Sequence, residues 1–160
     1  SDVYKRQCHV CLLRPYSRGT VSLASAKHND APLINPNFLT DNRDVDTLIK
    51  GAKMTQNILN TPPLKKYQKR EIYGVHSNLT DKEWEQHIRN RADTIYHPVG
   101  TCKMGKDPLA VVDSSLKIRG LKNIRVADAS IMPTITSGNT NAPTIMIGEK
   151  CATMIMDVHE

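Results

Sequence analysis

Residues 132–157 read MPTITSGNTNAPTIMIGEKCATMIMD, a loop of small polar residues that leads directly into an apolar helix. We expect the helix over residues 141–157 to be largely buried, because apolar side chains occupy most of its circumference. Pro143 lies in its first turn, where an amide proton has no helical partner. Asn139 or Asn141 could simply cap this helix. The same helix N-terminus would also favour an anion, because its amides carry a partial positive charge.

Residues 94–105 read TIYHPVGTCKMG and surround the histidine at position 97. Pro98 holds His97 in an extended conformation, and Gly100 and Gly105 allow close approach of another backbone. Imidazole titrates near physiological pH, so His97 could take a proton from a substrate hydroxyl. A histidine beside a proline can equally be structural, so this segment alone does not decide between the two roles.

The first half of the chain predicts a strand, a loop and a helix. Residues 20–25 alternate polar and apolar, which is typical of a half-buried strand. Residues 29–42 are rich in Asn, Pro and Asp and indicate a loop. The following helix should have Asp44 as its N-cap. Its buried face is expected to comprise Val45, Leu48, Ile49 and Ala52.

Residues 60–78 are basic and contain proline, so we expect them to be irregular. Thr80 and Glu83 then have the spacing of a capping box, which predicts a second helix. The inner face of that helix is expected to hold Trp84, Ile88 and Ala92. Further along, three short apolar segments predict strands at residues 109–113, 116–120 and 123–128.

Composition narrows the classes of protein to consider. The 160 residues suit one domain or a piece of a larger protein, and no apolar run is long enough to span a bilayer. The net charge of +6 raises the possibility of a nucleic-acid partner. Because the basic residues cluster only at 65–70, we interpret them as a solvated loop and predict no nucleic acid. Cys8 and Cys11 lack the second pair that structural zinc needs, so no metal site is predicted.

Taken together, these segments resemble the C-terminal part of the glucose–methanol–choline (GMC) family of flavin-dependent alcohol oxidoreductases. The resemblance extends from about Leu12 to Asp157, and the sequence of the motifs is most similar to the insect glucose-dehydrogenase-like branch. It rests on motifs that occur in the family's order, at residues 13–19, 32–39, 97–105, 111–113, 116–120, 124–133, 138–144 and 146–150.

The resemblance implies an α+β fold in two parts. Residues 12–95 would form part of the substrate-binding domain, an antiparallel sheet with flanking helices. Residues 96–160 would supply the catalytic-histidine segment and the C-terminal strand and helix of a Rossmann-like FAD-binding domain. Residues 1–11 are an uncertain leader. No GxGxxG motif is present, so the N-terminal half that binds FAD is expected to be a separate part of the same enzyme.

The resemblance also implies roles at the active site. His97 falls at the position of the family's catalytic base. Asn139 falls where the family carries a second active-site His or Asn, and an amide there can donate a hydrogen bond to the substrate oxygen without titrating. His97 and Asn139 are therefore expected to lie side by side and to converge on one open pocket.

The cofactor implied by the resemblance is FAD. Asp128 and Ala129 would contact it around the pyrophosphate and ribityl chain. Asn141, followed by Ala142 and Pro143 at the start of the last helix, would lie at the flavin's pyrimidine edge.

The implied function is oxidation of a small alcohol or sugar, with hydride transfer to FAD and His97 as general base. The chain alone would be inactive and would not retain FAD, because the cofactor half is missing. The alternative is an inactive structural or binding fragment.

Overall fold

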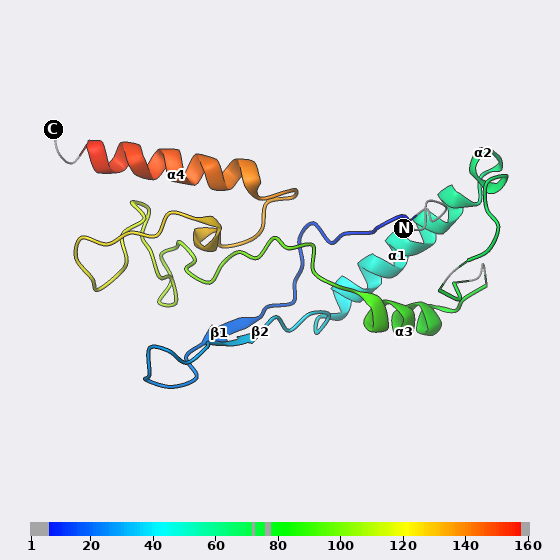
Figure 1. The fold of residues 1–160 in the computed structure, drawn as a ribbon, viewed down its shortest axis with the longest axis horizontal. Coiled ribbons are helices and arrows are strands. Elements are labelled where there is room, and N and C mark those ends of the chain that lie inside the picture. Colours follow the sequence, from blue (N-terminus) through cyan, green and yellow to red (C-terminus); the bar gives the residue numbers. More distant parts are fainter. Residues whose placement is uncertain (1–6, 72, 76–77, 158–160) are drawn as a thin grey trace. The chain divides into compact units, whose positions relative to one another are not determined.

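The computed structural model describes residues 7–71, 73–75 and 78–157. These residues form four α-helices, one short 3-10 helix and one two-stranded antiparallel sheet (Figure 1). They divide into two compact units. Unit 1 comprises the described residues up to Gly19 together with Pro36–Asp93, and unit 2 comprises Thr20–Asn35 and the described residues from Thr94 onward. The mixed composition agrees with the predicted α+β class, and residues 1–6 of the expected leader lie outside the described residues.

Unit 1 is built on two helices, α1 (Asn42–Leu59) and α3 (Asp81–Arg91), which pack against each other (Figure 1). The short helix α2 (Pro62–Lys65) lies between them in sequence and interrupts the segment predicted to be irregular. The core of the unit consists of Val45, Ile49, Trp84 and Ile88. The helix predicted around residues 45–52 is therefore present as α1, but α1 begins earlier and ends later than the apolar spacing indicated.

The N-cap of α1 is Asp41, so the prediction of Asp44 as its cap is wrong. The Asp41 carboxylate accepts from the Arg43 amide at 2.9 Å. Asp44 lies inside the first turn, 1% exposed, and accepts from the Tyr16 amide and from both the amide and hydroxyl of Ser17 at 2.6–2.8 Å. Burial alone would raise the pKa of Asp44, but the Ser17 hydroxyl and the two amides outweigh it and lower the pKa. Asp44 thus tethers the preceding segment to α1.

The capping box of α3 is confirmed. The Thr80 hydroxyl accepts from the Glu83 amide at 3.3 Å, and the Glu83 carboxylate accepts from the Thr80 amide at 2.7 Å. Trp84 and Ile88 are buried as expected. The prediction for Ala92 is wrong: it is the exposed C-cap, because the helix ends at Arg91 and the backbone becomes extended there.

Unit 2 begins with a hairpin of β1 (Thr20–Ser22) and β2 (Leu33–Asn35), in which Val21 pairs with Ile34. The first strand was predicted three residues too long, and β2 falls in a segment predicted to be loop. Both strands are exposed, contrary to the predicted half-burial. A two-stranded ribbon has no further layer of its own to cover either face.

Three short strands were predicted within residues 109–128, and this prediction is wrong, because the segments do not pair continuously. They form single bridges that join Val112 to Ile118 and Lys117 to Arg125. The chain reverses between them at Leu116 and Gly120, which have φ values of 64° and 78°. These left-handed positions leave each segment too short for continuous pairing.

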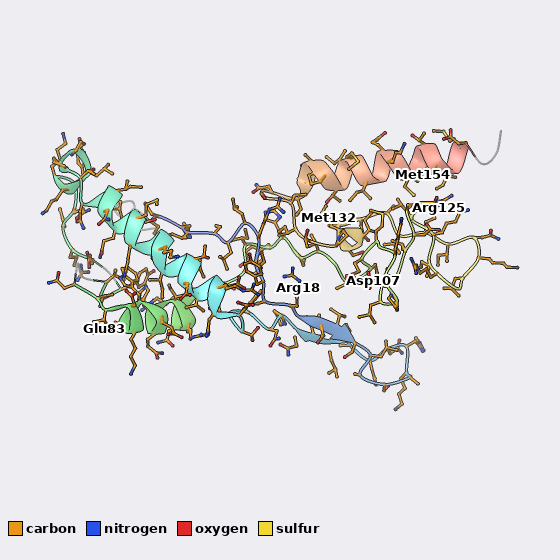
Figure 2. The ribbon with its side chains drawn as sticks, turned by 180° about the vertical axis from the view of Figure 1, so that it is seen from behind. Arg18, Glu83, Asp107, Arg125, Met132 and Met154 are labelled. Atoms are coloured by element: carbon orange, nitrogen blue, oxygen red, sulfur yellow. The ribbon has the colours of Figure 1, made fainter. Side chains whose placement is uncertain are left out.

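The core of unit 2 lies between helix α4 (Asn141–Met156) and the loops around the 3-10 helix η1 (Ala129–Ile131). Figure 2 labels two of its side chains, Met132 next to η1 and Met154 on α4. The buried residues of this core are Val112, Leu116, Ile131, Met132, Ile147 and Cys151.

Helix α4 is less buried than predicted. Ile147 and Cys151 face the core, whereas Ile145 and Met146 are 58% and 57% exposed. Only one side of the helix packs on η1 and its loops within the described residues, so an all-round apolar sequence leaves the other side uncovered. The described helices are each too short or too polar to span a bilayer.

Candidate functional site

The backbone on both sides of His97 is restricted. Tyr96 has a φ of 64°, in the left-handed region, and Pro98 follows directly. The His97 ring is half-buried, and its Nδ1 lies 2.9 Å from the Thr140 hydroxyl oxygen. This bond joins the histidine loop to the start of α4 within unit 2. His97 is therefore held by both its backbone and its ring.

The loop after His97 runs along η1. The Cys102 amide donates to the Ser130 carbonyl at 3.0 Å, and the Met104 amide donates to the Ile131 carbonyl at 2.7 Å. Gly100 has a φ of 91°, and a Cβ added there would lie 3.4 Å from the Met132 carbonyl oxygen. The close approach that the sequence indicated for this glycine is thus to the end of η1.

The α4 N-terminus begins at Thr140, which is 8% exposed. Its carbonyl accepts from the amide and hydroxyl of Thr144 at 3.0 and 2.6 Å. Its side chain makes no capping bond, and the first turn holds no acidic residue. Asn141 and Ala142 are exposed, and Pro143 is half-buried. The start of α4 is therefore open to solvent on one side and anchored to His97 on the other.

Asn139 is exposed and directly precedes Thr140. The His97–Thr140 bond brings the histidine to the neighbouring residue in the chain. Convergence of His97 and Asn139 on a common pocket stays a prediction.

Asp128 and Ala129 lie at the beginning of η1. The exposed Asp128 caps it, because its carboxylate accepts from the Ser130 amide at 2.7 Å. Ala129 is half-buried, and α4 packs on the 3-10 helix that it begins. The predicted cofactor residues therefore come from two elements that contact each other, and their contact with FAD stays a prediction.

An ion pair orders the next turn of the histidine loop. The Lys103 ammonium donates to the Asp107 carboxylate at 2.9 Å, and this bond is the main reason that the pKa of Asp107 is lowered.

The described residues contain no group of three His, Cys, Asp or Glu side chains that could hold a metal ion. A groove of about 520 Å³ is lined by α1 and α3, including Lys50 and Glu85, and so belongs to unit 1.

Thr140 is the residue at this site that the sequence interpretation missed. The sequence nevertheless contains a signal, which appears when residues 80–83 are compared with residues 140–143. Thr80 is followed at the third position by Glu83, whose amide it caps. Thr140 is followed at the third position by Pro143, which has no amide proton to offer.

Comparison with known proteins identifies the family. Residues 15–148 match the family model described as GMC oxidoreductase. The chain is 53% identical to an alcohol dehydrogenase [acceptor] of Pseudomonas putida, over 96% of this chain and 28% of that protein. It is 45% identical to an oxygen-dependent choline dehydrogenase of Cronobacter sakazakii, over 91% and 26%. The chain thus spans about a quarter of the length of these curated relatives.

Solved structures agree with this match. A formate oxidase of Aspergillus oryzae superimposes with a TM-score of 0.85 at 35% identity, over 92% of this chain and 26% of that one. A pyridoxine 4-oxidase from Mesorbium loti superimposes with a TM-score of 0.81 at 35% identity, over 88% and 28%. The finer placement beside insect glucose dehydrogenases is not supported, because the curated relatives named above are bacterial alcohol and choline dehydrogenases. The family prediction itself is confirmed: the chain belongs to the GMC oxidoreductases and corresponds to their C-terminal region.

Proposed function

We propose that this chain is the C-terminal, base-bearing portion of an FAD-dependent enzyme that oxidises a small alcohol. The observation that carries the proposal is the anchored imidazole of His97 at the open start of α4. Family membership supports the reaction class, and the names of the bacterial relatives favour an alcohol or choline-like substrate over a sugar.

The start of α4 fits one edge of FAD. Its first turn carries exposed residues, no acidic side chain and no side-chain cap, so its amides favour negative charge beside them. Asn141, Ala142 and Pro143 would hold this edge, and Asp128 and Ala129 would lie along the remainder of the cofactor. When bound, FAD supplies the acceptor for the hydride that leaves the carbinol carbon.

The chain's own residues handle the substrate oxygen. In this proposal Nδ1 of His97 donates to the Thr140 hydroxyl, so the ring takes the substrate's hydroxyl proton at Nε2. Asn139 donates a hydrogen bond to the same oxygen from the exposed loop ahead of α4. Asn139 does not titrate, so the site contains a single base.

We assign the two parts of the chain accordingly. Residues 12–95 belong to the substrate-binding domain, in which the hairpin of β1 and β2 is part of a larger antiparallel sheet. Residues 96–160 complete the FAD-binding domain, whose N-terminal half is the partner that this chain requires.

His97→Gln in the complete flavoprotein tests the proposal. Glutamine keeps a polar side chain but removes the base, so anaerobic flavin reduction by a primary alcohol should slow by about 10²–10⁴-fold. FAD content, read from the absorbance spectrum, should stay near normal. The control is His28→Gln, which alters an exposed histidine of the hairpin and should leave the rate unchanged. Normal flavin reduction in His97→Gln would show that His97 is not the base, and the proposal would fail.

A further inference from the structure

The hydroxyl of Thr140 does not perform the task that its position in the helix would give it. A threonine at an N-cap normally accepts a hydrogen bond from the amide two or three residues later, with its own backbone extended. Thr140 instead has φ −86° and ψ −4°, and it makes no side-chain cap. Its hydroxyl contacts His97 Nδ1 at 2.9 Å.

Pro143 explains this choice of partner. It occupies the third helical position of α4, one of the two positions whose amides a capping hydroxyl contacts. Proline has no amide proton, so the capping bond that Thr80 makes to Glu83 has no counterpart here. Thr140 is also buried, and a buried hydroxyl needs a hydrogen-bond partner. His97 is that partner.

The bond has a chemical consequence at the other nitrogen of the ring. A hydroxyl oxygen can accept from Nδ1–H both when the imidazole is neutral and when it is protonated. In the tautomer in which Nδ1 donates to this hydroxyl, Nε2 is the nitrogen left to gain and lose the proton. The amide and the hydroxyl of Thr144 both donate to the Thr140 carbonyl and hold Thr140 on α4. The imidazole bonded to Thr140 therefore keeps its orientation.

We infer that Thr140 is the positioning residue for His97, selecting the imidazole tautomer whose free Nε2 faces the substrate. This inference rests on the proposed function, since it concerns the same base. Thr140 touches neither the substrate nor the reacting atoms in this scheme, and acts only through His97.

The test compares Thr140→Val, Thr140→Ser and His97→Gln in the complete flavoprotein. Valine keeps the shape but removes the hydroxyl, so anaerobic flavin reduction should slow by about tenfold, the usual worth of one oriented hydrogen bond. Serine retains the hydroxyl and should restore the rate to within about twofold of the parent. The control is Thr153→Val, which removes a hydroxyl bond to the Glu149 carbonyl further along α4 and should leave the rate unchanged.

A double variant separates positioning from a general structural effect. If Thr140 acts through His97, adding Thr140→Val to His97→Gln should cause no further loss of rate. Equal losses in the single and double backgrounds would assign Thr140 a structural role and overturn the inference. It would also be overturned if Thr140→Val reduced its flavin at the parental rate, or if Thr140→Ser remained as slow as Thr140→Val. A parental rate in His97→Gln would instead refute the proposed function, so the two failures are distinguishable.

Discussion

Helices α3 and α4 each follow a threonine at the N-cap, and their N-termini are built in opposite ways. At α3, the Thr80 hydroxyl and the Glu83 carboxylate satisfy backbone amides reciprocally, and Asp81 adds negative charge to the first turn. At α4, the Thr140 side chain makes no cap and the first turn contains no acid. The first helix end is complete without a ligand, whereas the second retains the donors and the positive potential that an anionic group would use. The N-terminus of α3 is therefore satisfied by its own residues, whereas that of α4 has the open donors that the proposed cofactor contact requires.

The cores beneath the two helix ends differ as well. In unit 1, α3 packs on α1 through Trp84 and Ile88, so helix contacts helix. In unit 2, α4 packs on η1 and loops, through Ile131 and Ile147. The loops are ordered by backbone bonds rather than by a regular sheet, which suits a site assembled from separate segments.

Of the two cores, the helix–helix core of unit 1 should lose the most stability from a single substitution. Trp84→Ala should lower the free energy of unfolding of unit 1 by about 3–5 kcal/mol, because it removes the largest side chain between α1 and α3. Urea unfolding followed by far-UV circular dichroism measures the loss. Trp84→Phe is the matched control and should lose much less, since it refills most of the volume. A loss below about 1 kcal/mol for the alanine variant would mean that these helices do not form the core described.

A second effect concerns the tether of α1. Asp44→Asn should cost about 2–3 kcal/mol at neutral pH, because it weakens three hydrogen bonds to a buried carboxylate. Trp84 is the only tryptophan and lies in unit 1, so its fluorescence follows unfolding there. Asp46→Asn, an exposed change on the same helix, should alter stability by less than about 0.5 kcal/mol.

The Asp44 effect should depend on pH. Because the pKa of Asp44 is lower in the folded chain than its ordinary value of 3.8, protonation favours unfolding. The stabilisation is therefore complete well above pH 3.8 and is lost as the pH falls below that value toward the folded pKa. Asp41, whose pKa is lowered to about 2 by Arg43, titrates in both variants. The gap between parent and Asp44→Asn should thus narrow on acidification, and a constant gap would contradict the assignment.

The hydroxyls of Thr80 and Thr140 should each contribute little to the free energy of unfolding, and for different reasons. Thr80→Val should lower the free energy of unfolding by about 1 kcal/mol through loss of the cap. Thr140→Val removes the buried bond to His97 rather than a cap, so its loss of about 1 kcal/mol should disappear when His97 is already replaced by alanine. The Thr80→Val loss should be the same in both backgrounds. Thermal unfolding of the single and double variants measures the difference, and a Thr140→Val loss that persists without His97 would mean that this hydroxyl stabilises the helix itself.

Local patterns predicted the helices well, because their signals lie within a few residues. Thr80 and Glu83 identified the start of α3, and Asn141 was correctly included at the start of α4. Asp44 was misassigned because its partner Ser17 is 27 residues away and no local spacing reveals it. The strand β2 was missed because Pro and Asn dominate its surroundings, and its pairing with β1 depends on the turn between them.

The candidate site was only partly accessible to the same reasoning. His97 and the start of α4 were each singled out locally, but nothing in either segment indicates that they meet. Thr140 was overlooked because the asparagines on either side of it, Asn139 and Asn141, were the cap candidates, whereas the N-cap of α4 is Thr140. Its role depends on a missing amide at Pro143 and on a ring brought from another segment. Such a pair becomes visible only when both segments are placed in the fold.

The His97–Thr140 contact has a consequence for the order in which the molecule assembles. It joins residues 43 apart, and closing a loop of that length costs about 3 kcal/mol of chain entropy. One hydrogen bond returns about 1 kcal/mol, so this bond cannot organise the loop by itself. The pairing of Cys102 with Ser130 and of Met104 with Ile131 must form first and bring the two segments together. The base should therefore be among the last groups to become ordered during folding and among the first released by local opening, well before the core around Val112 gives way.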